Sequence, residues 1–92
     1  MTKTQAKTVV LKFMSEYDLP MPPTVIYRGL RLKTTFHNTD ETLRNHLGEM
    51  VDDELVLRVD PKALENGSID TTTDTSKRCY YVISDAGREK VD

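Results

Sequence analysis

Three closely spaced prolines decide how the first third of this chain can fold. Pro20, Pro22 and Pro23 cannot lie inside a helix, because each lacks an amide hydrogen and its ring clashes with the preceding turn. Before them, apolar residues recur at steps of three and four, which predicts an amphipathic helix over residues 4–17. Its expected buried stripe comprises Ala6, Val9, Val10, Phe13, Met14 and Tyr17.

A second helix is predicted from about Pro23 to Leu30, because proline is well suited to the first helical turn. This helix should bury Ile26 and Leu30, with Val25 or Tyr27 beside them. The segment RLKTTFHN then follows as a connector.

The connector leads to a third helix, predicted over residues 39–52, and Phe36 should anchor the connector in the core. Asn38 is expected to cap this helix, with Glu41 reaching back to the Asn38 amide in a capping box. Its apolar stripe consists of Leu43, Leu47, Met50 and Val51. The helix should end near Asp53 and dock one face on the core.

Two short segments, ELVLRVD and RCYYVIS, are rich in β-branched and aromatic residues and predict an antiparallel pair of strands. Alternation puts one set of side chains on the inner face of each strand. The expected sets are Leu55, Leu57 and Val59 on the first strand, and Cys79, Tyr81 and Ile83 on the second. Between the strands, Asp60 and Pro61 can start a helical turn that Gly67 ends. Ser84 or Asp85 should cap a C-terminal helix, AGREKV.

Length, hydrophobic content and net charge exclude some classes of partner but do not identify one. Ninety-two residues with 37% hydrophobic and 30% charged content predict one domain over residues 1–92. No apolar run approaches the roughly 18 residues of a membrane span, and MTKTQAKTVV lacks the apolar centre of a leader. We therefore expect a cytoplasmic protein without a membrane partner. A net charge of −2 means that any nucleic-acid binding must depend on locally placed arginines and lysines.

Patterns for catalysis and metal binding are missing from the sequence. Cys79 is the only cysteine, and the two histidines, His37 and His46, have no spacing that suits a tetrahedral site. The carboxylates at 52–54 are interpreted as a solvated helix corner rather than a divalent-ion site. No glycine-rich phosphate loop or nucleophile elbow occurs. We expect neither an enzyme nor a bound cofactor.

The order of elements, together with two stretches of sequence, carries a resemblance to a known family. LRNHLGEMVDDELVLRV, followed by YYVISDAGREKV, resembles the segment from recognition helix through wing in the winged helix-turn-helix superfamily. PPTVIYRGLRL with its Thr-Phe connector is similar to small haloarchaeal members, including those related to the phage phiH repressor. The resemblance covers nearly the whole chain and implies an archaeal source. It also implies an α+β fold with a three-helix core, a two-stranded antiparallel wing and a short C-terminal helix.

The chain departs from that family in two places. Such domains usually turn from the third helix into the strand at a glycine, where this chain has Glu54. A left-handed backbone there should cost roughly 1 kcal/mol if it is kept. The connector before the third helix is also longer than that of a tight helix-turn-helix.

The resemblance implies that helix 39–52 enters the major groove and that residues 60–77 form the wing. With its apolar stripe inward, that helix presents Glu41, Thr42, Asn45, Gly48, Glu49 and Asp52, with Arg44 at the flank. Asn45 can bond adenine, and Arg44 can reach guanine or a phosphate. Thr39 and Thr42 can contact a phosphate or a thymine methyl group. Further phosphate contacts are expected from Arg28, Arg31, Lys33, Lys77 and Arg78.

Two interpretations of function stay open. The first is a non-catalytic transcriptional regulator that binds double-stranded DNA sequence-specifically as a homodimer. Val56, Tyr80 and Val82 are expected to face outward, as a partner surface or as ordinary exposed apolar residues. The second is a winged-helix interaction module that docks another protein and does not bind DNA. The polar face of the third helix suits both, and it is also what a solvated surface looks like.

Overall fold

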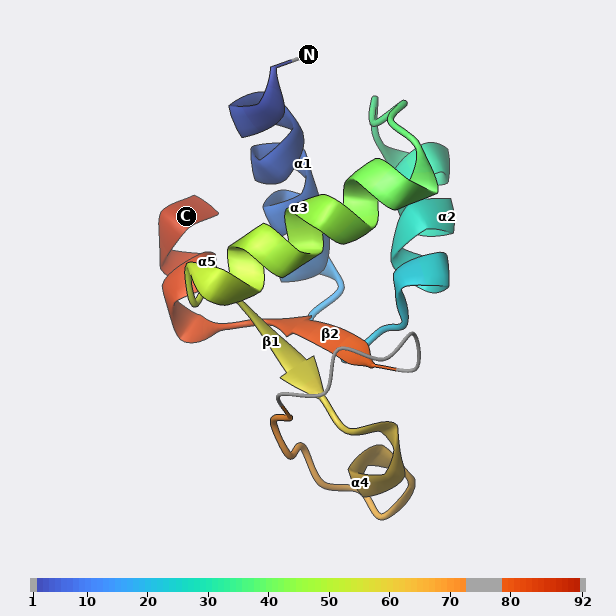
Figure 1. Cartoon of the computed structure of the whole chain (residues 1–92), viewed down its shortest axis with the longest axis vertical. Helices are drawn as coiled ribbons and strands as arrows, with labels where there is room; N and C mark the ends of the chain where they lie inside the picture. Colours follow the sequence, from blue (N-terminus) through green and yellow to red (C-terminus); the bar gives the residue numbers. More distant parts are fainter. Residues whose placement is uncertain (1, 73–78, 92) are drawn as a thin grey trace.

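The prolines separate two helices in the computed structural model, which describes residues 2–72 and 79–91 (Figure 1). The first helix, α1 (Lys3–Glu16), starts with a capping box between Thr2 and Gln5. Its buried residues are Ala6, Val10, Leu11, Phe13 and Met14. Tyr17 was expected in this stripe but is 41% exposed, because α1 ends before it. Its ring packs on that of Phe13, with 4.8 Å between centroids.

The second helix, α2 (Pro23–Lys33), continues three residues beyond the predicted end at Leu30. Thr34 ends it, because both its amide, at 3.0 Å, and its hydroxyl, at 2.6 Å, donate to the Leu30 carbonyl. Ile26 is buried as predicted. Tyr27 packs partly against the core, whereas Val25 is exposed.

The third helix, α3 (Asp40–Asp52), is capped by Thr39 and not by Asn38. The Thr39 hydroxyl accepts from the amide of Thr42 at 3.2 Å. The predicted capping box at Asn38 is therefore wrong, because the neighbouring threonine, which is also a good N-cap residue, takes the position. The predicted stripe is confirmed: Leu43, Leu47 and Met50 are fully buried, Val51 packs partly on the core, and Phe36 is buried in the connector.

The two strands, β1 (Val56–Val59) and β2 (Tyr80–Ile83), pair antiparallel as predicted. The expected inner set of the second strand, Cys79, Tyr81 and Ile83, is buried. Of the inner set expected on β1, Val59 is fully buried and Leu55 packs partly against the core, but Leu57 was predicted wrongly. Val56 lies opposite Ile83 in the core, whereas Leu57 lies opposite Val82 and is 36% exposed. The expected outward strip of Val56, Tyr80 and Val82 therefore does not form, since Val82 is also buried.

The turn that ends α3 explains the shift in β1. The amide of Leu55 donates to the Met50 carbonyl at 2.9 Å, and that of Glu54 donates to Val51 at 3.0 Å, which is a Schellman arrangement. Glu54 has φ 63°, so it keeps a left-handed conformation that is easiest for glycine. Because the Leu55 amide closes the turn that follows α3, the strand begins at Val56.

Short bridges extend the sheet at both edges. Met21, between α1 and α2, exchanges backbone hydrogen bonds of 2.9 and 2.8 Å with Tyr81. On the other edge, Thr71 forms a bridge with Val59. The predicted helical turn between the strands is confirmed as α4 (Pro61–Glu65). The wing predicted at 60–77 lies partly outside the described residues.

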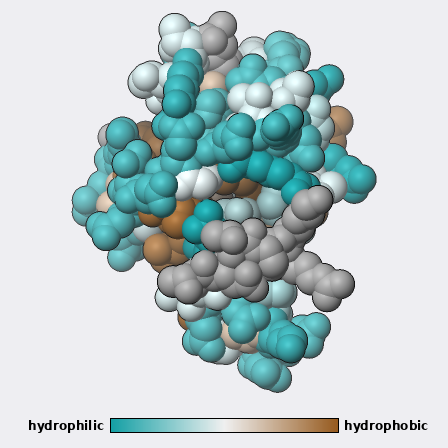
Figure 2. Space-filling view, in the orientation of Figure 1, coloured by the Kyte–Doolittle hydropathy of each residue, from teal (hydrophilic) through white to brown (hydrophobic). Residues whose placement is uncertain are grey.

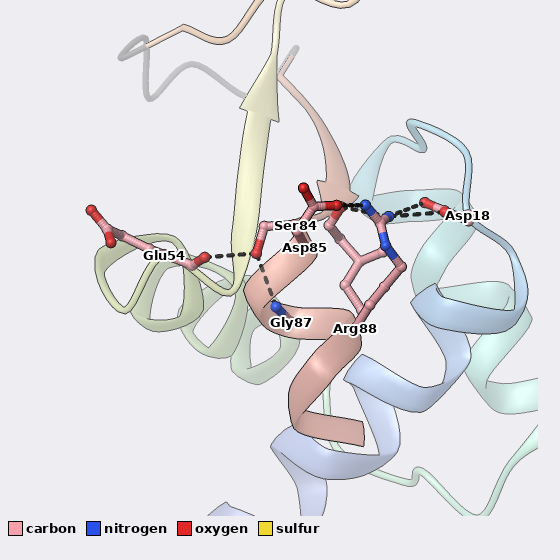
Figure 3. Close-up of polar contacts among 7 residues, drawn as sticks. Asp18, Glu54, Ser84, Asp85, Gly87 and Arg88 are labelled. Atoms are coloured by element: carbon pink, nitrogen blue, oxygen red, sulfur yellow. Dashed lines mark hydrogen bonds and ion pairs between the residues drawn. The ribbon is translucent and has the colours of Figure 1, made fainter. Parts of the chain in front are cut away.

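Ser84 connects the end of α3 to the start of the last helix, α5 (Asp85–Val91). Figure 3 shows its hydroxyl between two backbone groups: it donates to the Glu54 carbonyl at 2.7 Å and accepts from the Gly87 amide at 3.0 Å. Ser84 is thus the cap that the sequence predicted as one of two candidates. Arg88 of α5 binds the Asp18 carboxylate, at 2.9 and 3.0 Å, and so ties α5 to the end of α1.

The elements form an α+β arrangement of helices and a two-stranded antiparallel sheet. In Figure 1, α3 crosses in front of α1, its first turn lies beside the upper end of α2, and the sheet continues toward α4 below. The helix pairs α1 with α5 and α2 with α3 are in contact. One face of α3 is therefore covered by the core and the opposite face is left open.

We predict that Glu54→Gly stabilises the protein by about 0.5–1 kcal/mol, because removing the cost of a left-handed non-glycine residue outweighs the entropy of an added glycine. The Glu54 side chain is exposed, so little contact is lost. Urea unfolding followed by circular dichroism measures the change. Asp53→Gly is the matched control, since φ at Asp53 is −84° and glycine there should destabilise. A Glu54→Gly protein less stable than wild type would contradict this account of the turn.

Candidate nucleic-acid interface

The open face of α3 is polar, and Figure 2 shows a largely hydrophilic surface over this helix. Its exposed residues are Glu41, Asn45, Asp52 and the capping residue Asp53, with Gly48 half-buried among them. This is the side opposite Leu43 and Leu47, as expected for a helix that buries a single stripe. The net charge of this face depends on which of its carboxylates are paired with cations.

Two lysines of α1 offset the negative charge of Glu49. Its Oε2 atom lies 2.7 Å from Lys3 Nζ and 2.9 Å from Lys7 Nζ. Hydrogen bonds from these two lysines lower the pKa of Glu49 to about 2. The carboxylate therefore belongs to a contact between α1 and α3, and its charge is offset locally.

His46 is buried beside this contact, and its Nδ1 atom has no hydrogen-bond partner. Nδ1 is 3.9 Å from Glu49 Oε1, which is too far for a hydrogen bond. Burial lowers the pKa of His46 below 6.5, and Lys7 and Lys3 act in the same direction, whereas Glu49 opposes the shift. The imidazole is thus neutral near pH 7, as a packed histidine.

The predicted DNA-contacting residues of α3 and its cap differ in whether their side chains already have a partner. The hydroxyl groups of Thr39 and Thr42 form a hydrogen bond, with 3.0 Å between their oxygens. Both are therefore already engaged at the capped start of α3. Arg44 pairs with Asp40 one turn earlier, with 3.3 Å between Nε and Oδ2. Asn45 is exposed and its side chain has no partner among the described residues. Of these four, Asn45 is the most available for an external contact.

Asn45 also lines a groove between the starts of α1 and α3. The groove is bordered by Thr2, Lys3, His37, Asn38, Thr39, Thr42, Asn45, His46 and Glu49. Its lining is polar, which suits charged or hydrogen-bonding partners better than an apolar ligand.

The predicted cations of α2 are all exposed. The C-terminal end of α2 lies beside the first turn of α3 (Figure 1). Arg31 lies over the ring of Tyr27, 5.7 Å from its centroid, with Nη1 3.4 Å from the phenol oxygen. Within the described residues, the side chains of Arg28 and Lys33 form no hydrogen bond or ion pair. Both are free to meet an anion. Lys77 and Arg78 lie outside the described residues.

Sequence reasoning missed Arg58 and the lysines of α1. Arg58 projects from the sheet face that carries Val56, and its Nη2 atom lies 3.8 Å from where a Cβ on Gly48 would be. Nothing local predicts this contact, although a glycine inside a helix is a weak signal of close approach. Lys3 and Lys7 are more than forty residues from Glu49, so only the fold reveals their pairing.

The described residues form neither a metal-ligand cluster nor a membrane-spanning helix. Among the described residues, no three histidine, cysteine or acidic side chains are grouped as metal ligands. In the same part of the chain, no helix combines the length and apolar character needed to cross a bilayer. In comparisons with known proteins, no family model, no curated protein and no solved structure matched the chain.

We predict that Glu49→Gln lowers stability at neutral pH and that the loss disappears in acid. The folded-state pKa is depressed, so the wild-type advantage is complete above pH 4.5 and is lost as the pH falls toward about 2. Thermal unfolding of both proteins between pH 2 and 7 measures this difference. Glu89→Gln is the control, because Glu89 is exposed and has no described ion pair. A difference independent of pH would contradict an ionic role for Glu49.

Proposed function

We propose that the protein is a winged helix-turn-helix regulator that binds double-stranded DNA sequence-specifically, with α3 in the major groove and residues 60–77 as the wing. The element order and the antiparallel pair β1–β2 are compatible with this layout. The proposal includes Asn45 and Arg44 as base-reading residues, and Arg28, Arg31, Lys33, Lys77 and Arg78 as phosphate contacts.

One observation supports the proposal most: on the open face of α3, Asn45 has no side-chain partner in the described part of the chain, while Glu49 and Asp40 are paired with lysines and an arginine. An amide side chain near the first half of a groove-bound helix is well placed to bond adenine. Lys33 is the last residue of α2, and this end of the helix lies beside the first turn of α3 (Figure 1). Phosphate contacts there would fix the helix in the groove.

We also propose a cytoplasmic homodimer without catalytic activity. Helix-turn-helix dimers place two recognition helices about one helical turn of DNA apart, which matches a palindromic site. Sedimentation equilibrium, with and without duplex DNA, would establish whether two copies assemble.

A second candidate is a protein-interaction module, which is favoured by the carboxylates that stay unpaired. Glu41 and Asp52 lie on the open face of α3 and have no ion pair among the described residues. These charges repel phosphate but suit a basic protein surface. A fluorescent duplex titrated at low and at high salt separates the candidates, since no binding in either condition would favour the interaction module.

We predict that Asn45→Ala weakens binding to the preferred site by roughly 5–150-fold, the value of one bidentate base contact. The preferred site is obtained by selecting bound sequences from a random duplex pool. Binding to unrelated duplexes and its salt dependence should change little, because no charge is removed. Adding Arg44→Ala should weaken binding further.

Lys12→Ala is the control for these variants, because Lys12 is exposed on α1 and lies about 140° around that helix from Lys7. If the Asn45→Ala, Arg44→Ala protein binds the selected site as tightly as wild type, α3 is not the reading element.

A further inference from the structure

The side chain of Arg58 has no partner among the residues that the structure describes. Its side chain is half-buried and its Nε atom is fully buried, yet Nε has no hydrogen-bond acceptor. Among the described residues no carboxylate lies within ion-pair distance of its guanidinium. A charged group that is partly removed from water without a counter-ion is destabilising. Folding alone does not explain an arginine at this position.

Arg58 reaches α3 at the one glycine of that helix. Glycine inside a helix costs stability relative to alanine, so it usually marks a steric need. Gly29 and Gly87 meet such a need, since a Cβ would lie 2.3 Å from Phe13 Cζ and 2.2 Å from the Leu55 carbonyl oxygen. At Gly48 a Cβ would meet only Arg58, at an ordinary 3.8 Å. The space that Gly48 leaves is therefore not used by the fold.

We infer that Arg58 and Gly48 form a phosphate-binding position, in which the guanidinium donates to a DNA phosphate and the missing side chain lets the DNA backbone approach α3. The inference rests on the proposed DNA-binding function and adds a contact to it. A guanidinium presents several N–H donors in a planar fork that matches phosphate oxygens. The unpaired charge of Arg58 and the open helix surface at Gly48 are at the same place, as such a contact requires.

A phosphate contact is favoured over a base contact by the position of Arg58 in the fold. Arg58 comes from β1 and approaches α3 at Gly48, to one side of Asn45, which lies on the middle of the open face. A groove-bound helix meets bases along its centre and the sugar-phosphate backbone along its flanks.

Arg58→Met tests the phosphate contact, because methionine keeps an apolar stem but removes the charge. We expect binding to weaken by roughly 10-fold or more at low salt, both on the preferred site and on unrelated duplexes. The slope of log K against log salt should fall by about 0.9. The melting temperature should stay the same or rise, since a buried N–H without an acceptor is removed. A merely structural arginine would instead lower the melting temperature.

Gly48→Ala tests the close approach independently. The melting temperature should rise by roughly 4–8 °C, because alanine favours the helix, while DNA binding weakens. Lys12→Met is the control for Arg58→Met, since it removes one exposed cation elsewhere and should leave the salt slope unchanged.

The outcomes separate this inference from the proposed function. Wild type that binds no duplex would overturn both. Wild type that binds DNA, with Arg58→Met and Gly48→Ala binding equally well, would overturn the inference alone and leave α3 as the reading helix. A loss for Arg58→Met limited to the preferred site, with an unchanged salt slope, would mean a base contact and would also overturn it.

Discussion

The position of α3 depends most on the two hydrogen bonds made by the hydroxyl group of Ser84. It donates to the Glu54 carbonyl and accepts from the Gly87 amide, while the Ser84 amide donates to the Leu55 carbonyl at 3.0 Å (Figure 3). The end of α3, the start of β1, the end of β2 and the start of α5 therefore meet at one residue. A buried hydroxyl that satisfies two backbone groups is costly to remove, because both would be left unpaired.

A second attachment fixes the rotation of α3 about its axis. At the C-terminal end, the turn through Glu54 holds the direction of the helix. Further along α3, Lys3 and Lys7 hold Glu49 against α1. With these constraints and the buried stripe, the helix cannot roll, so Asn45 stays outward and Gly48 stays beside Arg58. The surface chemistry of α3 thus follows from contacts made on its other sides.

Local signals predicted the elements well, and the errors arose where neighbouring elements compete for the same residue. Adjacent Asn38 and Thr39 can both cap a helix, and their sequence alone does not rank them reliably. The prediction for Leu57 of β1 was wrong because the turn that ends α3 uses Leu55. The resemblance pointed to Glu54 as the residue that would be left-handed if the usual turn were kept, and Glu54 does have that conformation. The pairing of Lys3 with Glu49 joins distant segments, so no local pattern could reveal it.

The acidic character of α3 is less of an obstacle to DNA binding than its composition suggests. Asp40 and Glu49 carry their own counter-ions, and the opposing charge of Arg58 lies against the same helix. Glu41 and Asp52 repel phosphates through solvent, an effect that salt screens over about 10 Å at 0.1 M and 3 Å at 1 M. A guanidinium in direct contact with a phosphate is partly shielded from that screening. Rising salt screens the repulsion by Glu41 and Asp52, but it also removes the counterion-release contribution of the phosphate contacts, so binding still weakens as salt increases.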